Sequence, residues 1–321
     1  PAHASHALAH ISQLEASAVP VTVLGFGDRQ FPNFCQFALS VDAALAGKGV
    51  SRLHAIELID RCSASQFSEW GNRVGEVIGT PLFLNYCALQ PATVKLELVE
   101  RADYGIAVQA PTSIFRFKPA EQGGWLTASP RRFKALPPFE AGDLLGVIPP
   151  HGQPPRFYSL ASSANDEIVE ICVRKQAGGL CSGYLHDLKP GDCIDGFIRP
   201  NPGFRPATGN RPVILVGAGA GIGPLTGFIR NNTRCNPMYL YWGGRDARSD
   251  FLYQPELGRY LEDHRLSGLN TAFSRTDERA YVQDKLKQDE LAVRQMVNTG
   301  AQILVCGGRD MAAAVRQVIE D

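Results

Sequence analysis

The chain has 321 residues, which is long enough for about two domains that each bury a core of their own. Its 32 Lys and Arg residues balance its 32 Asp and Glu residues, and no run of one sign is long enough to bind nucleic acid or an anionic membrane surface. The eight cysteines never stand two or three residues apart, so no zinc-binding pair and no redox CxxC pair is present. We therefore expect reduced thiols in a cytoplasmic protein that binds neither a metal ion nor nucleic acid.

The most apolar window, residues 212–228, contains five glycines and two prolines. This composition predicts a buried strand and turn and excludes a membrane span there. The sequence has no initiator Met and no signal-peptide pattern, so we expect a piece of a longer chain. If another part of that chain carries an anchor, the protein would lie on the cytoplasmic face of a membrane.

The first 80 residues alternate between helix-like and strand-like segments. After an Ala-rich start, the apolar run 21–24 and the apolar stretch 53–59 are typical of strands, whereas 35–46 and 67–77 are typical of helices. This alternation predicts a parallel α/β sheet.

Residues 81–207 show short alternating runs, such as 93–99, that are broken repeatedly by Pro and Gly. This pattern predicts an antiparallel barrel. Two segments in it are similar, 139–143 and 188–192, since each ends in Gly-Asp and leads into a strand-like run. We expect two turns in which Gly supplies an unusual φ.

Residues 208–321 return to the alternation of strands and helices. The strand-like runs are 213–216, 238–242, 269–274 and 302–306, with helical stretches between them. A second doubly wound parallel domain is expected here.

The sharpest local signal is the glycine-dense turn that follows strand 213–216 and opens a helix. Its residues Gly219, Ala220 and Gly221 would present backbone N–H groups and a helix N-terminus to a pyrophosphate. A tight strand-to-helix turn without a ligand remains the alternative.

A second signal is the segment 156–159, which places a guanidinium and an aromatic ring on one strand face. Arg156 suits a phosphate, Tyr158 suits a flavin ring, and the hydroxyl of Ser159 lies beside them. The alternative is an ordinary strand with an exposed Arg. Twenty residues later, 178–182 precedes a helix-like segment and offers N–H groups and a hydroxyl to an anion.

A third signal follows the predicted strand 269–274. Ser274, Arg275, Arg279 and Tyr281 supply a hydroxyl, two guanidiniums and a ring, which suit an adenosine with a 2′-phosphate. An NAD site would usually have an acidic residue near the ribose, so NADPH is favoured over NADH. A solvated charged loop before a helix is the alternative.

In this order, the segments resemble the diflavin reductases, namely the flavoprotein subunit of sulfite reductase and the NADPH-dependent haemoprotein reductases, built on a ferredoxin-NADP reductase core. The resemblance covers nearly the whole chain. It implies the C-terminal part of a flavodoxin-like FMN domain in 1–80, with only part of its doubly wound sheet. It also implies an antiparallel Greek-key FAD barrel without a large helical insertion in 81–207, and a doubly wound, C-terminally truncated NADP-binding domain in 208–321.

The resemblance also implies residue roles. In the family, the residues matching Arg156, Tyr158 and Ser159 contact the pyrophosphate, the isoalloxazine and the region near N5 of FAD. Cys306 resembles the thiol beside the nicotinamide, so Ser159 and Cys306 are the catalytic candidates. Further FAD contacts are implied for Phe157, Cys172, Val173, Arg174, Gly179, Leu180, Cys181 and Ser182. NADP contacts are implied for Gly219, Ala220, Gly221, Ser274, Arg275, Arg279, Tyr281 and Gln283.

The segment 23–35 is similar to a flavodoxin loop that wraps the FMN ring. The resemblance implies FMN contacts from Asp28, Phe31, Phe34 and Cys35, whereas an ordinary strand-to-helix loop would bury the two Phe rings in the core. The phosphate loop of a flavodoxin would precede residue 1, so FMN is expected in the full-length protein. Three positions depart from the family: Ala220 replaces Thr, Gly223 replaces Ala, and Gly308 replaces the Asp of its CGD motif.

The function implied by the resemblance is that of an NADPH-dependent flavoprotein reductase. Hydride would pass from NADPH to N5 of FAD, and single electrons would continue through FMN to a haem or metal centre in another protein or domain. One alternative is a single-flavin oxidoreductase of the ferredoxin-NADP reductase type, whose flavodoxin remnant only docks a partner. A non-catalytic interaction protein on a degenerate reductase fold is the other.

Overall fold

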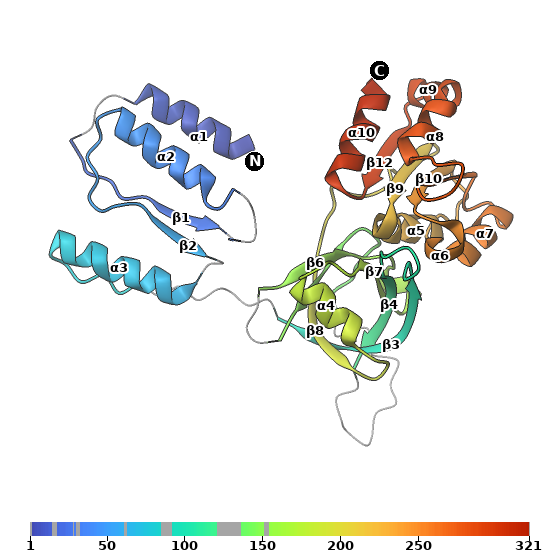
Figure 1. Cartoon of the computed structure of the whole chain (residues 1–321), viewed down its shortest axis with the longest axis horizontal. Helices are drawn as coiled ribbons and strands as arrows, with labels where there is room; N and C mark the ends of the chain where they lie inside the picture. Colours follow the sequence, from blue (N-terminus) through green and yellow to red (C-terminus); the bar gives the residue numbers. More distant parts are fainter. Residues whose placement is uncertain are drawn as a thin grey trace. The chain divides into compact units, whose positions relative to one another are not determined.

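The computed structural model describes residues 2–14, 18–27, 29, 33–60, 63–84, 92–120, 136–150 and 154–320. The chain divides into two compact units, Pro1–Pro91 and Ala92–Asp321 (Figure 1). No helix within the described ranges is both long and apolar enough to cross a membrane.

The first unit contains a two-stranded parallel sheet with helices on both sides (Figure 1). Strand β1 runs beside β2, with Leu24 opposite Glu57 and Gly27 opposite Asp60. The α/β alternation predicted for this region is therefore present in the described residues. The elements are α1 (Ala2–Gln13), β1 (Leu24–Gly27), α2 (Gln36–Gly47), β2 (Glu57–Asp60) and α3 (Ala64–Ile78).

The first strand lies later in the sequence than its apolar run predicts. The run 21–24 was expected to be the strand, but the strand is Leu24–Gly27, and Val21 makes only an isolated bridge with Arg52. Helix α2 packs directly on this strand, because a Cβ on Gly25 would lie 2.7 Å from the Cβ of Ala38. Close helix packing selects glycine there, although glycine has a low strand propensity.

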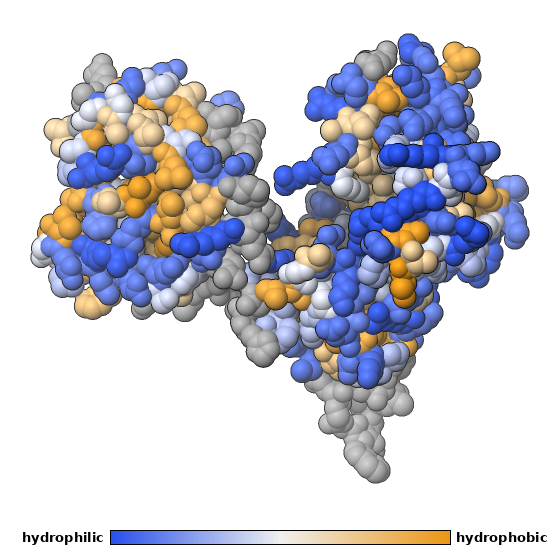
Figure 2. All heavy atoms as spheres, viewed as in Figure 1, coloured by the Kyte–Doolittle hydropathy of each residue, from blue (hydrophilic) through white to orange (hydrophobic). Residues whose placement is uncertain are grey.

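Large hydrophobic side chains are exposed on the first unit. Phe26 is 47% exposed and Phe83 is 88% exposed, and Phe37 and Val77 are also exposed. Figure 2 shows hydrophobic residues gathered over the visible face of this unit.

The second unit begins with an antiparallel sheet of six strands in the order β6-β5-β8-β3-β4-β7. A bridge between Leu160 and Ile171 joins the two edges, so the sheet curls round on itself. Fully buried side chains such as Leu96, Phe115 and Leu145 fill its interior. Its elements are β3 (Val94–Tyr104), β4 (Thr112–Pro119), β5 (Leu144–Ile148), β6 (Arg156–Ser159), η2 (Ala164–Asp166), β7 (Val169–Arg174), α4 (Leu180–Asp187) and β8 (Cys193–Arg199).

The two similar turns occur where the sequence predicts them. Gly142 has φ 86° and leads into β5, and Gly191 has φ 98° and leads into β8. In each turn the following aspartate accepts a hydrogen bond from the backbone N–H three residues earlier, at 2.9 Å for Asp143 and 2.7 Å for Asp192. Glycine is required here because side chains disfavour positive φ.

The rest of the second unit is a parallel sheet of four strands in the order β11-β10-β9-β12. The strand predicted at 302–306 has these bounds in the structure, and the other three predicted strands are present with ends that differ by one or two residues. The elements are β9 (Val213–Ala218), η3 (Gly219–Gly221), α5 (Ile222–Arg230), β10 (Met238–Gly244), α6 (Ala247–Asp250), α7 (Gln254–Glu262), β11 (Gly268–Phe273), α8 (Val282–Gln288), α9 (Glu290–Asn298), β12 (Gln302–Cys306) and α10 (Arg309–Glu320).

Strand order reverses at β9, because β10 and β11 extend the sheet on one side of it and β12 lies on the other. In open parallel sheets of this kind, ligands bind at the carboxyl ends of the strands beside the reversal. The glycine turn and Cys306 both lie at that edge, since they directly follow β9 and end β12.

One hydrophobic core spans the antiparallel and parallel sheets. It combines Ile114 and Ala161 of the antiparallel sheet region with Leu215, Leu225 and Trp242 of the parallel sheet region. Helix α5 can lie close to the antiparallel sheet because Gly227 faces it, and a Cβ on Gly227 would lie 2.6 Å from the carbonyl oxygen of Ala161. The two sheets are therefore held together by tight packing.

Candidate functional site

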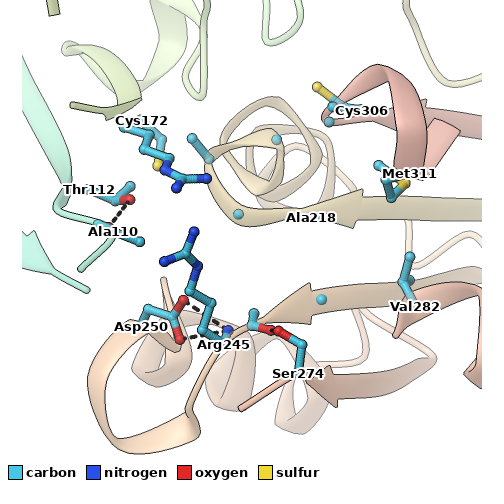
Figure 3. Close-up of a pocket in the computed structure, with 18 of the residues that line it drawn as sticks. Ala110, Thr112, Cys172, Ala218, Arg245, Asp250, Ser274, Val282, Cys306 and Met311 are labelled. Atoms are coloured by element: carbon cyan, nitrogen blue, oxygen red, sulfur yellow. Dashed lines mark hydrogen bonds between the residues drawn. The ribbon is translucent and has the colours of Figure 1, made fainter. Parts of the chain in front are cut away.

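A cavity of about 750 Å³ lies where the antiparallel and parallel sheets meet (Figure 3). Its walls include Tyr158 and Cys172 from the antiparallel sheet, and Gly219, Gly244 and Cys306 from the carboxyl ends of the parallel strands. This size is within the range of about 300–1,000 Å³ that is usual for small-molecule and cofactor sites. The cavity is the candidate functional site.

The glycine turn after β9 forms the centre of the cavity wall. Gly219 has φ 52°, and a Cβ built on it would meet no atom within 4 Å, so the turn is open to the cavity there. The indole Nε1 of Trp242 donates a hydrogen bond to the Gly219 carbonyl at 3.2 Å and holds the turn from behind. Helix α5 begins directly after the turn, and its Ile222 N–H bonds to carbonyls within the turn. The open backbone at Gly219, beside the positive end of a helix, fits an anionic group such as a pyrophosphate.

Strand β6 supplies the aromatic wall of the cavity. Phe157, Tyr158 and Ser159 all line the cavity. The Tyr158 side chain is hydrogen-bonded to the Cys181 thiol, and burial, followed by this bond, raises the pKa of the Tyr158 hydroxyl far above its usual value. Tyr158 is therefore a neutral, fixed ring, which suits contact with a planar aromatic ligand.

The turn before α4 uses its hydroxyl group internally. The Ser182 Oγ accepts a hydrogen bond from the Gln176 N–H at 3.1 Å and donates one to the Gly179 carbonyl at 3.3 Å. The sequence predicts that this hydroxyl would be offered to an anion, whereas the structure uses it to close the turn. Helix α4 also begins at Leu180, inside the segment 178–182 that was expected to precede the helix. The N–H groups of its first turn remain for an anion.

Two thiols line the cavity, that of the buried Cys172 from β7 and that of the half-buried Cys306 from the end of β12. Burial raises the pKa of Cys306 to about 11. Burial also raises the pKa of Cys172 strongly, with smaller contributions from Glu170 and Cys306. Both thiols are therefore neutral near pH 7, and neither is an activated nucleophile.

The residues after β11 only partly reach the cavity. Ser274, Tyr281 and Gln283 line it, and the Ser274 Oγ donates a hydrogen bond to the Gly244 carbonyl at 3.3 Å. The Arg279 guanidinium lies 5.1 Å from the centre of the Tyr281 ring and donates a hydrogen bond to its hydroxyl. Arg275 instead donates a hydrogen bond to the Val108 carbonyl, at 2.9 Å.

Arg245 is a cavity residue that the sequence analysis missed. Figure 3 shows its guanidinium in the space between Thr112 and Ala218. Its backbone N–H donates to the carboxylate of Asp250, and its Nη1 donates to the Val108 carbonyl at 2.7 Å. Burial, then the charges of Arg174 and Arg275, lower the pKa of Arg245, so the cavity has a concentration of positive charge. Arg245 follows β10, and only the strand order of the folded sheet places β10 beside β9 and its glycine turn.

The structure brings most of the predicted nucleotide-binding residues to one cavity. Those that line it are Phe157, Tyr158, Ser159, Cys172, Arg174, Gly219, Ala220, Gly221, Ser274, Tyr281, Gln283 and Cys306. Those of the second unit that do not line it are Arg156, Val173, Gly179, Leu180, Cys181, Ser182, Arg275 and Arg279. Among the described residues, no group of three His, Cys, Asp or Glu side chains could hold a metal ion.

The predicted FMN residues belong to the first unit. Asp28 and Phe31 lie outside the described residues. Cys35 is buried with φ 51° at the start of α2, and its Sγ would lie 2.7 Å from a Cβ on Gly27. The Phe34 ring is covered by the guanidinium of Arg29 at 5.3 Å. Cys35 therefore has a packing role between β1 and α2.

Comparisons with known proteins match an oxidoreductase domain and parts of longer NADPH-dependent proteins. A family model described as an oxidoreductase NAD-binding domain matches residues 215–317. The chain is 36% identical over 186 residues to NADPH–cytochrome P450 reductase of Dictyostelium discoideum, covering 52% of this chain and 28% of that protein. It is 39% identical over 195 residues to the sulfite reductase (NADPH) flavoprotein alpha-component of Vibrio vulnificus, covering 55% of this chain and 31% of that protein. The chain thus spans less than a third of the length of these curated relatives.

A structural comparison matches the ferredoxin-NADP+ reductase of Plasmodium falciparum, solved with 2′P-AMP. The TM-score is 0.55 at 20% identity, and the match covers 71% of this chain and 91% of that one. At this identity the likeness concerns the fold: an antiparallel sheet followed by a parallel, nucleotide-binding type of sheet.

Proposed function

We propose that this chain belongs to the diflavin reductase family built on a ferredoxin-NADP reductase core, and that it is the reductase part of an NADPH-dependent flavoprotein. Its cofactor is FAD and its electron donor is NADPH. In the full-length protein, FMN receives the electrons and passes them singly to a haem or metal centre in another protein or domain. In this proposal, residues 1–80 are part of a flavodoxin-like domain, 81–207 are a Greek-key FAD domain, and 208–321 are the NADP-binding domain.

The observation that carries this proposal is that two different walls line the same cavity. A flavin-type wall from β6 and β7 faces a dinucleotide-type wall from the ends of β9 and β12. The antiparallel wall offers a fixed ring, Tyr158, and the parallel wall offers the open turn at Gly219. These groups suit an isoalloxazine ring and a pyrophosphate, so the residues present fit the two cofactors.

When bound, FAD would supply the hydride acceptor that no amino-acid side chain provides. The residues of this chain contribute position and electrostatics. The Tyr158 ring and the turn at Gly219 would orient the two ring systems from opposite walls, and apolar packing around Trp242 would exclude water behind the turn. The hydroxyl of Ser159 can donate a hydrogen bond to a ring nitrogen, and the neutral thiol of Cys306 lies at the same edge without carrying charge.

The preference for NADPH follows from groups in the segment after β11, of which Ser274 and Tyr281 line the cavity and Arg279 contacts Tyr281. Ser274 and the pair formed by Arg279 and Tyr281 supply a hydroxyl, a cation and a ring for a 2′-phosphorylated adenosine. The carboxylate of Asp250 accepts backbone hydrogen bonds from Arg245 and Asp246, which hold it at the turn after β10. Arg245 adds positive charge that favours a phosphorylated ligand.

One observation favours the single-flavin alternative, in which the first unit docks a partner without holding FMN. Cys35, one of the predicted FMN contacts, is buried in packing between β1 and α2. Phe34 is engaged by the guanidinium of Arg29. Identification of the flavins in the full-length protein separates the two functions: FAD with FMN supports the diflavin relay, and FAD alone supports the alternative.

The test is the visible spectrum of the purified protein, loaded with FAD, before and after anaerobic addition of NADPH. We expect rapid bleaching with NADPH and bleaching at least about tenfold slower with NADH, because the 2′-phosphate contacts are charge-assisted hydrogen bonds. If the protein binds no FAD, the flavin wall is wrong. If FAD binds but neither nucleotide bleaches it, the protein is not a reductase and the non-catalytic alternative stands.

A further inference from the structure

A buried ion-pair network crosses the seam between the antiparallel and parallel sheets, away from the cavity. Its hub is the carboxylate of Glu170 on β7, whose side chain is only 1% exposed. Glu170 accepts a hydrogen bond from Nε of Arg116 at 2.6 Å and another from Nη2 of Arg230 at 2.9 Å. Arg116 belongs to β4 in the antiparallel sheet, whereas Arg230 ends helix α5 of the parallel sheet region. One carboxylate therefore joins both regions.

The network crosses the seam at further points. Arg116 also donates to Glu256 of α7 at 3.2 Å, and Arg230 donates to the carbonyl of Ala161 at 3.1 Å. The side chain of Arg230 receives additional support from the hydroxyl of Tyr260, at 3.3 Å. Burial opposes the charge of both guanidiniums, but the coulombic attraction of Glu170 outweighs it and raises their pKa, so Arg116 and Arg230 stay charged. The hydrogen bonds between these buried charged groups are directional, so they resist sliding of α5 along β7.

Helix α5 connects this network to the cavity. The glycine turn that lines the cavity leads directly into α5, and Arg230 is the last residue of the helix. Between them, Gly223 lies over Cys172, since a Cβ on Gly223 would be 3.0 Å from the Cys172 Cβ. Strand β7 runs alongside with the same span, from Glu170 at the network to Cys172 and Arg174 at the cavity. Helix α5 and strand β7 thus both run from the network to the cavity, and the network fixes them at one end.

Apolar side chains of α5, such as Leu225 and Phe228, pack in the shared core, but Gly223 presents no side chain where the helix lies against β7. The ion pairs of Glu170 therefore add the directional contacts between α5 and β7. We infer that Arg230 and Glu170 are positioning residues, which set the alignment of the glycine turn on α5 with the flavin wall on β7. The inference rests on the proposed function, because that function is what makes the alignment matter. A displacement of about 1 Å between reacting groups can slow a reaction by up to about a hundredfold.

The test compares the full-length wild-type protein with Arg230→Met, Arg230→Lys and Glu256→Gln. Arg230→Met is preferable to a Glu170 variant, because Glu170 keeps Arg116 and no buried carboxylate is left unpaired. Arg294→Met is the matched control, since Arg294 pairs only with Glu290 of its own helix, at 2.7 Å, and both side chains are exposed. Each variant is assayed at a temperature at which its far-UV circular dichroism shows it fully folded.

For Arg230→Met we expect FAD content to stay unchanged and the rate of FAD bleaching by NADPH to fall about tenfold or more. The KM for NADPH should change less than about threefold, since no proposed contact with NADPH is lost. With NADPH deuterated at the transferred position, the isotope effect on kcat should rise, because hydride transfer becomes slower relative to the other steps. Arg230→Lys should recover part of the rate, and Arg294→Met should match the wild type.

Amide hydrogen exchange supplies a readout that does not depend on activity. We expect Arg230→Met to increase amide exchange at the cavity ends of the two elements, in 218–223 before and at the start of α5 and in 171–174 of β7. Exchange in β3 should stay as in the wild type. If Arg230→Met does not fold, Glu256→Gln tests the contact between Arg116 and Glu256 with the same readouts. An unchanged rate, isotope effect and exchange pattern would overturn the inference. If NADPH does not bleach FAD bound to the wild-type protein, the proposed function is wrong. The exchange pattern of Arg230→Met would then still show whether Arg230 holds α5 in position on β7.

Discussion

Gly221 passes directly over the end of β12, so close that a Cβ on Gly221 would lie 2.1 Å from the carbonyl oxygen of Cys306. No Cβ fits at that distance, and the obstacle is backbone that cannot rotate away. The contact fixes the glycine turn against the strand that carries the thiol.

Replacing Gly221 with Ala should therefore displace the turn from β12. We expect Gly221→Ala to lower the rate of FAD bleaching by NADPH by about a hundredfold, because a displacement of about 1 Å misaligns the nucleotide. Stopped-flow absorbance measures this rate. The control is Gly258→Ala in helix α7, where a Cβ meets no atom within 4 Å and alanine should stabilise the helix by about 0.5–1 kcal/mol. A normal rate in Gly221→Ala would show that the turn does not contact the nucleotide.

Coenzyme preference should depend on Ser274, whose hydroxyl lines the cavity. In Ser274→Ala we expect kcat/KM for NADPH to fall about tenfold, since the hydroxyl would turn from the Gly244 carbonyl, 3.3 Å away, to the 2′-phosphate, and a hydrogen bond to a charged group is worth about 1.5–3 kcal/mol. The value for NADH should change less than about twofold, because NADH has no 2′-phosphate. Thr299→Ala is a suitable control, because the Thr299 hydroxyl donates only to the carbonyl of Met296 at the end of its own helix. Equal losses with both nucleotides would place Ser274 elsewhere in the site.

The neutral state of Cys306 predicts slow alkylation. Burial raises its pKa to about 11 from the ordinary 9.0, so little thiolate exists at pH 7.5 and the fraction should increase until about pH 11. Mass spectrometry of the peptide that carries Cys306, after timed exposure to iodoacetamide, measures the rate. Cys193 is exposed and provides the comparison. Alkylation of Cys306 at pH 7.5 as fast as that of Cys193 would contradict the burial argument.

The stability of the second unit should decrease in mild acid because of His186. This ring is buried between β4, β7 and α4, with Nε2 3.1 Å from the Val173 carbonyl and Nδ1 3.3 Å from the Ser113 Oγ. Burial lowers its pKa below 6.5, so the unfolded chain binds the proton first and stability is lost as the pH falls through 6.5. The carboxyl group of Asp103, whose pKa is lowered from 3.8, titrates only in stronger acid.

Thermal unfolding between pH 5 and pH 8 measures this effect. We expect the midpoint to fall between pH 6.5 and pH 5 in the wild type, and to fall less in His186→Gln, which cannot take up the proton. His264→Gln controls for removal of a histidine at the end of α7. The same decrease in His186→Gln and in the wild type would assign the acid sensitivity to other groups.

Strand positions in the parallel sheet could be predicted because buried apolar runs there coincide with strands. The run 302–306 is strand β12 in the structure. Strand β1 could not be predicted in this way, because its residues include Gly25 and Gly27, which are selected by contact with α2 and Cys35. Contacts between distant segments determine such glycines, and no local pattern contains that information.

The cavity could be predicted in outline, because the glycine turn and the segment 156–159 have local signatures. Arg245 was missed since a lone arginine after a strand has no signature until the strand order is known. The hydrogen bond from the Gln176 N–H to the Ser182 hydroxyl could not be predicted either, because it depends on where Gln176 lies in the folded turn. Side-chain partners of this kind become apparent only after the chain has folded.

The core shared by the two sheets has a consequence for modularity. Ile114 and Ala161 from the first sheet pack in one cluster with Leu225 and Phe228 from helix α5. Excising either half would leave much of this cluster facing water, at about 25 cal/mol for each Å² of apolar surface exposed. The halves should therefore melt in one transition, and recombination between homologues should succeed only when both are inherited together.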